Sequence, residues 1–281
     1  MQSSRAAKFM THELAFAQGY VRTPGGFRHK SFVHRLAPGQ AVSRRSGRAA
    51  IVDLTTKRQV ELPAPAVPAQ DLSGMGGGWI AWADWTNATG TPVSSFLTTW
   101  VVPPPPATQS GQLIYLFNAL EDQAGENILQ PVLQWGESGA GGGNEWGVAS
   151  WYVDSSHHAF CTPVIPVDPG DTLIGVLTLV SQEDGLFNYS SAFQGRPATA
   201  LIAQGLAELV LATETLEVYG LTKSSDYPDA PVTRMAGIDI RAGANPAPVQ
   251  WAPEVMDNPS FGEHTTVVSN QTPGGEVDLC Y

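Results

Sequence analysis

Short runs of alternating apolar and polar residues fill most of the chain between about Ser95 and Gly243. The run 95–102 (SFLTTWVV) is typical, because its side chains alternate with the two-residue period of a β-strand. Similar runs recur with turn-forming Gly, Pro, Asn and Asp between them, and no stretch keeps a convincing helical period. The pattern predicts an all-β fold: a two-sheet antiparallel β-sandwich of the jelly-roll or concanavalin-like kind.

Changes in composition divide the chain into three parts. Residues 1–78 form a basic N-terminal segment, in which 31–62 reads as short strands and 63–78 as a Pro- and then Gly-rich connection. Residues 79–243 are the predicted sandwich domain, and 244–281 are predicted to wrap its surface as a Pro- and Asn-rich tail. The short N-terminal strands cannot bury a core alone, so we expect them to dock on the sandwich.

Charge separates the same parts. Residues 1–70 hold eleven of the 15 Lys and Arg residues and three acidic residues, a net charge of +8, whereas residues 71–281 carry 4 basic and 23 acidic residues, a net charge of −19. So acidic a body excludes nucleic-acid binding through phosphate contacts, which need clustered cations. Opposite charges within one chain instead favour docking of the basic segment on the acidic body.

Other classes of protein find little support in the sequence. No apolar stretch approaches the roughly 18–20 residues of a membrane helix, and the first residues lack the apolar core of a signal peptide. Cys161 and Cys280 form either one disulfide or, slightly favoured, two free thiols. With no metal-ligand spacing present, His157 and His158 read as loop residues, and we expect neither a metal nor a cofactor. The sequence leaves the oligomeric state open.

Five motifs, taken in order, resemble those of one known family. SFLTTWVVP (95–103) is similar to its entry strand, FNALED (117–122) stands where it has Trp-Val-Gly-Ile-Asp-Gly, and NILQPVLQWG (127–136) where it has Ile-Leu-Gln-Thr-Gly. SWYV (150–153) stands in place of Glu-Trp-Tyr-Pro, and TLEVYGL (215–221) in place of Ala-Glu-Trp-Ile-Val-Glu. Over about 150 residues the chain thus resembles the glutamic peptidases, or eqolisins, and also a broader set of uncharacterised relatives with the same sandwich.

The resemblance implies a secreted, acid-acting endopeptidase with a polypeptide substrate. Carried over residue by residue, it makes Glu217 the catalytic glutamate and Gln130 the catalytic glutamine. It also gives four candidate substrate contacts: Phe117, Glu121, Trp151 and Tyr152. The chain departs from the family after the glutamine, where Pro131-Val132 replaces Thr-Gly, and at Ser150, which replaces a glutamate.

A carboxylate and a carboxamide that face one water molecule are sufficient for amide hydrolysis. Glu217 would take a proton from water as general base, and the Gln130 amide would donate to the oxyanion. The pair requires that both side chains share one sheet face, which the alternation in each strand permits. We therefore predict that Gln130 and Glu217 lie in one groove, within reach of a shared water.

Two other functions stay open. Eight tryptophans invite a lectin-like, glycan-binding interpretation, although each one alone is more often a core residue. A catalytically inactive sandwich is the other alternative, with Glu217 an ordinary solvated strand residue. The resemblance also implies that residues 1–78 are a basic pro-segment which leaves when acid neutralises the carboxylates of the body. If they are instead permanent strands, Phe32, Val33, Ile51 and Leu54 should be buried in the main core.

Overall fold

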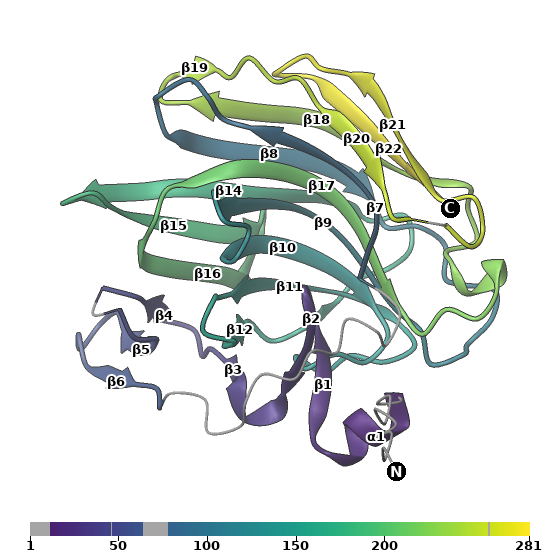
Figure 1. The fold of residues 1–281 in the computed structure, drawn as a ribbon, viewed down its shortest axis with the longest axis horizontal. Helices are drawn as coiled ribbons and strands as arrows, with labels where there is room; N and C mark the ends of the chain where they lie inside the picture. Colours follow the sequence, from purple (N-terminus) through teal and green to yellow (C-terminus); the bar gives the residue numbers. More distant parts are fainter. Residues whose placement is uncertain (1–11, 46, 64–77, 258) are drawn as a thin grey trace, which may run out of the picture.

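The computed structural model describes residues 12–45, 47–63, 78–257 and 259–281, and nearly all of their regular structure is strand (Figure 1). Two large sheets, one of nine and one of eleven strands, make up the body, and a separate two-stranded hairpin stands against it. The predicted all-β sandwich is confirmed. No helix among the described residues is long and apolar enough to cross a membrane.

The N-terminal segment forms more structure than its sequence pattern predicts. Helix α1 is short and ends ahead of Gly19, whose φ of +86° suits glycine. The elements before residue 63 are α1 (His12–Ala17), β1 (Tyr20–Thr23), β2 (Gly26–His29), the 3-10 turn η1 (Lys30–Phe32), β3 (Val33–Arg35), β4 (Gln40–Ser43), β5 (Ala50–Asp53) and β6 (Gln59–Glu61). The strands expected within 31–62 are confirmed, the hairpin β1–β2 was not predicted, and residues 64–77 lie outside the described residues.

The nine-stranded sheet has the order β20–β7–β17–β9–β10–β11–β12–β3, with β13 paired to β11. Its further strands are β7 (Gly78–Thr86), β9 (Leu113–Asp122), β10 (Ile128–Trp135), β11 (Trp146–Val153), β12 (Ala159–Cys161), β13 (Ile165–Pro166), β17 (Leu209–Tyr219) and β20 (Ala252–Val255). Every residue of β9, β10 and β11 is buried, so both faces of the sheet centre are covered.

The eleven-stranded sheet has the order β21–β22–β18–β8–β14–β15–β16–β4–β5–β6, with β19 beside β18. Its further strands are β8 (Val93–Val101), β14 (Thr172–Glu183), β15 (Leu186–Phe193), β16 (Arg196–Leu206), β18 (Val232–Ala242), β19 (Asn245–Pro246), β21 (His264–Ser269) and β22 (Gly275–Cys280), and a 3-10 turn η3 (Ser224–Asp226) precedes β18. Alternating buried and partly exposed positions along β8 and β22 show that one face of this sheet packs on the core.

The two ends of the chain complete opposite edges of both sheets (Figure 1). On the N-terminal side, β3 pairs with β12 and β4 with β16, and both pairs are parallel, which is an exception to the predicted antiparallel pairing. On the C-terminal side, β20 pairs with β7 and β22 with β18. The described residues among 244–281 therefore contribute four strands, β19 to β22, to the two sheets, where a surface tail was predicted.

Two hydrophobic clusters lie on opposite faces of the nine-stranded sheet. The larger fills the space between the sheets. The smaller contains residues of the nine-stranded sheet together with Ala15, Tyr20 and Phe27 from the N-terminal segment. We call the side that carries this second cluster the outer face. The two cysteines lie apart as free thiols, Cys161 in the outer-face cluster and Cys280 in β22.

Candidate active site

Side chains on the outer face line up in rows across neighbouring strands. One row follows the cross-strand pairs that Glu217 of β17 makes with Tyr115 of β9, and Tyr115 with Gln134 of β10. Because paired residues of neighbouring strands project to the same side, these three side chains share the outer face. Tyr115 and Tyr219 both belong to the outer-face cluster, which confirms the side to which Glu217 points. We call this set the Glu217 row.

Glu217 is buried, with no exposed surface, yet only a thin cover separates it from solvent. Its Oε1 atom accepts hydrogen bonds from the backbone N–H of Gly25, at 2.8 Å, and from the hydroxyl of Tyr219. Gly25 itself is exposed. The second carboxyl oxygen, Oε2, is buried without a hydrogen-bond partner. One oxygen is thus held in place, and the Trp79 side chain also interacts with the carboxyl group and acts against the rise of its pKa.

The cover over Glu217 is the hairpin β1–β2, residues 20–29, which we call the cover hairpin. Its turn, Thr23-Pro24-Gly25-Gly26, has glycines with φ of +75° and +116°, conformations that other residues rarely adopt. Arg22 fixes the hairpin to the body by donating to the carbonyl oxygens of Gly111, at 2.9 Å, and Glu137, at 3.3 Å. Phe27 packs edge-on against Tyr219, with ring centroids 5.5 Å apart.

Burial changes the protonation of Glu217. Removal from water raises the pKa of this carboxyl group to about 7, although hydrogen bonds from Tyr219 and Gly25 and the charge of Arg28 act against the rise. A raised pKa means that the folded, covered protein holds Glu217 largely as the neutral acid below pH 7. The covered glutamate is therefore in the wrong state to act as a base in acid solution.

Gln134 closes the other end of the Glu217 row. Its Nε2 atom donates to the carbonyl oxygens of Gly136, at 3.0 Å, and Gly141, at 2.9 Å, while its Oε1 atom accepts from the hydroxyl of Ser138, at 3.0 Å. The loop folds closely around this amide, because a Cβ atom on Gly142 would lie 2.5 Å from Nε2. The amide is thus oriented by its own loop, with both N–H groups in use.

The structure separates Gln130 from Glu217. Both side chains belong to the outer face, as predicted, since Gln130 alternates with Ile128 and Val132 of the outer-face cluster. In register, however, Gln130 falls four residues from Gln134, which is about 13 Å along the strand. With β9 in between, the two cannot share one water. The expected Gln130–Glu217 pair is therefore not assembled in this arrangement, and Gln134 is the glutamine of β10 that shares a row with Glu217.

The four predicted substrate contacts fall on different sides of the sheet. Phe117, Glu121 and Trp151 belong to the outer face, and Phe117 contacts the Trp79 ring, with centroids 6.0 Å apart. Tyr152 points between the sheets instead, where it stacks on Phe160. This is a correction, and its reason is the alternation of β11, which sends neighbours 151 and 152 to opposite faces.

Sequence reasoning missed Gln134, Tyr115 and the cover hairpin. A signal for the first was present: Leu-Gln occurs twice in ILQPVLQWG, and only the second copy has Gly two residues after the glutamine, as in Ile-Leu-Gln-Thr-Gly. The register that places Tyr115 between Glu217 and Gln134 has no such signal, because it depends on pairing between distant strands.

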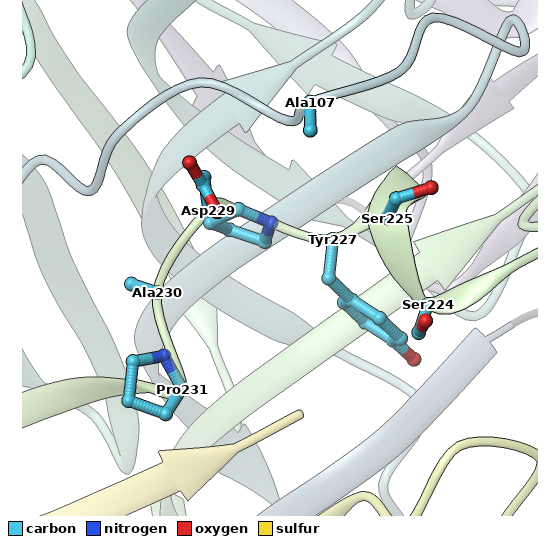
Figure 2. A pocket seen from close by; sticks show the side chains of 8 residues that line it. Ala107, Ser224, Ser225, Tyr227, Asp229, Ala230 and Pro231 are labelled. Carbon is cyan, nitrogen blue, oxygen red and sulfur yellow. The ribbon is translucent and has the colours of Figure 1, made fainter.

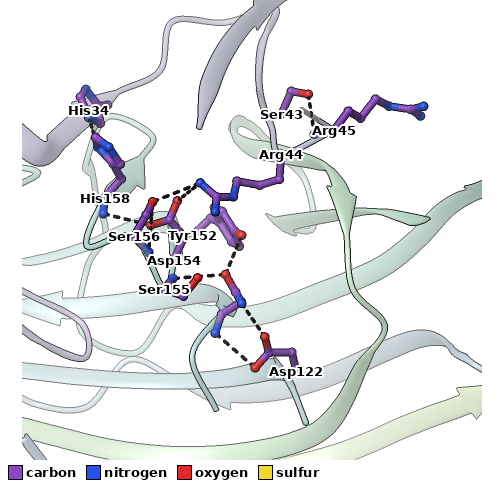
Figure 3. A network of polar contacts seen from close by, with 11 residues as sticks. His34, Ser43, Arg44, Arg45, Asp122, Tyr152, Asp154, Ser155, Ser156 and His158 are labelled. Carbon is purple, nitrogen blue, oxygen red and sulfur yellow. Dashed lines mark hydrogen bonds and ion pairs between the residues drawn. The ribbon is translucent and has the colours of Figure 1, made fainter. Parts of the chain in front are cut away.

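A polar network joins the N-terminal segment to the body beside β11 and β12 (Figure 3). Arg44 forms an ion pair with the buried Asp154, at 3.2 Å, and donates to Ser156, at 3.1 Å. One step away, the rings of His34 and His158 share a hydrogen bond of 2.9 Å. Each pair has one member in the N-terminal segment and one in the body, so both pairs report on docking.

Two surface pockets lie away from the Glu217 row. The larger, of about 340 Å³, is bounded by Ala107, Ser224, Ser225 and the turn 227–231 (Figure 2). The smaller, of about 200 Å³, lies beside the network of Figure 3 and includes Arg44, Asp122 and Tyr152. Neither contains Glu217, Gln134 or Gln130.

Comparison with known proteins gave matches among solved structures alone. No protein-family model and no curated protein matches the chain. The chain is similar to the crystal structure of Scytalido-glutamic peptidase with a peptide-based transition state analog, with 13% identity over 73% of this chain and 100% of that one, and a TM-score of 0.49. It is also similar to SCP-B, a member of the eqolisin family in complex with the tripeptide Ala-Ile-His, with 12% identity, the same coverage and a TM-score of 0.45. These structures come from the family that the sequence motifs resemble.

Proposed function

We propose that the chain is an acid-acting endopeptidase of the glutamic type, with Glu217 as general base and Gln134 as oxyanion donor. The observation that carries the proposal is the state of Glu217: a buried carboxyl group on the outer face with one oxygen fixed by Gly25 and Tyr219 and the other unpartnered. The motif around Glu217 resembles that of the glutamic peptidases, which supports the same assignment.

Spacing in the Glu217 row suits the reaction. Two strand spacings separate Glu217 from Gln134, about 10 Å between their backbones, and both side chains extend from the same face. Tyr115 of β9 lies between them on the same face, so a peptide carbonyl and one water would bind over its side chain. Glu217 takes a proton from that water, whose oxygen attacks the carbonyl carbon. Gln134 exchanges one of its two loop carbonyl partners, Gly136 or Gly141, for the substrate and donates that N–H to the oxyanion. The proton then passes from Glu217 to the leaving nitrogen as the C–N bond breaks.

The cover hairpin keeps this form inactive. It occupies the space that a substrate needs, and in this closed form burial raises the pKa of Glu217 to about 7. At pH 4 that pKa leaves about one glutamate in a thousand ionised, whereas a solvated glutamate with its ordinary pKa is about one-quarter ionised. Activity in acid therefore requires the hairpin to leave, which makes residues 20–29 the inhibitory part of the described N-terminal segment.

Strands β3 and β4 have a different role, because they are paired edges of the two sheets. Phe32 is buried, while Val33, Ile51 and Leu54 are partly buried. The pairing of β3 with β12 and of β4 with β16 supports the interpretation that these two strands are part of the body. We propose that this part stays in place when the cover hairpin leaves.

Hydrolysis of a denatured protein between pH 2 and 4 tests the function directly. The wild-type chain should release peptides after incubation in acid, and Glu217→Gln should release none while unfolding at the same temperature. Acid incubation that gives no cleavage with the wild type contradicts the proposal.

A further inference from the structure

A second row on the outer face lies about four residues from the Glu217 row. It follows the pairs of Thr213 in β17 with Ala119 in β9, and of Gln130 in β10 with Trp151 in β11. Gln130 falls beside Ala119, because the flanking pairs are Leu129 with Leu120 and Val132 with Phe117. We call Thr213, Ala119, Gln130 and Trp151 the Ala119 row. Its centre is the small side chain of Ala119, between the polar ends of Thr213 and Gln130.

The polar atoms of the Ala119 row have no partners. Both side-chain atoms of Gln130, the Thr213 hydroxyl and the Trp151 indole nitrogen are buried without a hydrogen bond. The nearby Thr215 hydroxyl and Glu121 Oε1 are in the same state. Each unpaired buried polar group costs about 1–3 kcal/mol, and the described residues hold twenty such side-chain atoms, six of them here. Six such atoms on one sheet face indicate a surface that is completed by a bound molecule.

Gln130 differs from Gln134 in its hydrogen bonds. Both glutamines are buried, lie on the same strand and point to the same face. Gln134 makes three hydrogen bonds within its own loop, whereas Gln130 makes none. The Gln130 amide therefore offers a donor and an acceptor together, and another amide is one group that satisfies both at once.

The surroundings define the partner further. The row contains an amide, a hydroxyl and an indole N–H, and none of them carries a charge. Burial, together with the nearby Asp122 and Asp84, raises the pKa of Glu121 to about 8, so this carboxyl group is also neutral in acid. Phe117 and Val132 supply apolar walls from the adjoining row. A neutral polar group with an apolar stem fits this chemistry, whereas a charged side chain would be desolvated without a counter-ion.

We propose that the Ala119 row is a substrate subsite for an Asn or Gln side chain about four residues from the scissile bond. The spacing follows from the register, because four residues of extended chain cover about 13 Å. The inference rests on the proposed peptidase function and adds to it a preference for one class of side chain.

Peptide libraries with one varied position test the subsite. Acid-treated wild type should prefer Asn or Gln at one position, about four residues from the cleaved bond, by 10- to 100-fold in kcat/KM over Leu of similar size. Gln130→Leu should abolish that preference, so that kcat/KM for the Asn and Gln peptides falls to the value that the same variant has for the Leu peptide. Its thermal unfolding temperature should be unchanged or higher, since an unpaired amide is removed.

The outcomes separate the two proposals. If wild type and Gln130→Leu show the same preferences, or if no position favours Asn or Gln, the subsite is overturned and the peptidase function stands. If Glu217→Gln cleaves as well as the wild type, or the wild type cleaves nothing, the function falls and the subsite falls with it. Loss of the preference in Thr213→Val, which removes only a hydroxyl, would support the subsite independently.

Discussion

Two buried glutamates, Glu214 and Glu217, stand three residues apart on β17 and point to opposite faces of the sheet. Glu214 points between the sheets, where it accepts a hydrogen bond from Thr98 of β8. Glu217 points to the outer face and accepts from Gly25 of the cover hairpin. Burial raises the pKa of both. Neither burial nor a raised pKa therefore identifies the functional residue.

The two glutamates differ in whether the group that hydrogen-bonds them belongs to a sheet of the sandwich or to the hairpin outside both sheets. The partner of Glu214 belongs to the opposite sheet, so Glu214 can be uncovered only by unfolding the sandwich. The backbone partner of Glu217 belongs to a two-stranded hairpin outside both sheets. A buried acid beneath a separable cover is suited to catalysis under control, whereas one between two sheets is structural.

The largest expected effect comes from exchanging each glutamate for glutamine. Glu217→Gln should lower peptide hydrolysis at pH 3–4 by at least about 10³-fold, because the amide cannot take a proton from water. Glu214→Gln should retain activity within about threefold, since glutamine replaces the neutral acid and still accepts from Thr98. Initial rates of acid-treated proteins, with thermal unfolding as the check on folding, measure both. Equal losses of hydrolysis rate in the two variants would show that Glu217 has no catalytic role distinct from that of Glu214.

The second effect concerns the two glutamines of β10. Gln134→Ala should lower kcat by about 10²–10³, the usual consequence of losing one oxyanion donor. Because Gln134 also holds its loop, Ser138→Ala is the matched control: it removes one hydrogen bond from the Gln134 amide and leaves its N–H groups in place. A larger loss of kcat in Gln130→Ala than in Gln134→Ala, on a substrate without Asn or Gln, would return the catalytic role to Gln130.

A third, smaller effect tests the cover. Arg22→Ala removes two hydrogen bonds between the hairpin and the body and should raise activity before acid treatment by about 5- to 10-fold, corresponding to about 1 kcal/mol. Arg48→Ala is the control, because Arg48 pairs with Glu61 inside the N-terminal segment, at 3.7 Å. Assays at pH 5 without acid pretreatment compare the two variants. Unchanged activity in Arg22→Ala, with the hairpin more sensitive to protease, would show that the hairpin does not inhibit.

The smallest effect is the pH dependence of docking. Burial and the neighbouring His158 lower the pKa of His34 to about 4, against an ordinary 6.5, while Asp154 acts in the opposite direction. The contribution of His34 to docking is therefore largest above pH 6.5 and falls by about 1 kcal/mol, after solvent screening, as the pH drops toward 4. The raised pKa of Glu217 opposes this trend between pH 7 and 4.5, because the covered state favours the neutral acid.

Limited proteolysis at pH 7 and pH 4.5 measures the contribution of His34. In His34→Asn the cleavage rate of the N-terminal segment should change less between the two pH values than in the wild type. His264→Asn, at an exposed position of β21, should behave as the wild type does. An identical pH dependence in His34→Asn and the wild type would show that His34 does not contribute to the pH dependence of docking.

The strands that form the body could be read from the sequence, because each carries its own alternation. The C-terminal strands could not: Pro and Asn around β20 and β21 resemble a loop, and these strands form because β7 and β22 offer unpaired edges. The face of Glu217 was predictable from alternation along β17. The row to which Glu217 belongs could not be predicted, because the pattern within β17 or β10 does not fix the register between distant strands.

The cover hairpin is synthesised well before the strands that it contacts. Gly25 and Glu217 are 192 residues apart, and His34 and His158 are 124 apart. The hairpin therefore leaves the ribosome long before the strands on which it rests, and such distant contacts form late in folding. Until then the outer face has no cover from this hairpin. A chain that lacked the hairpin would therefore fold with Glu217 uncovered on the outer face.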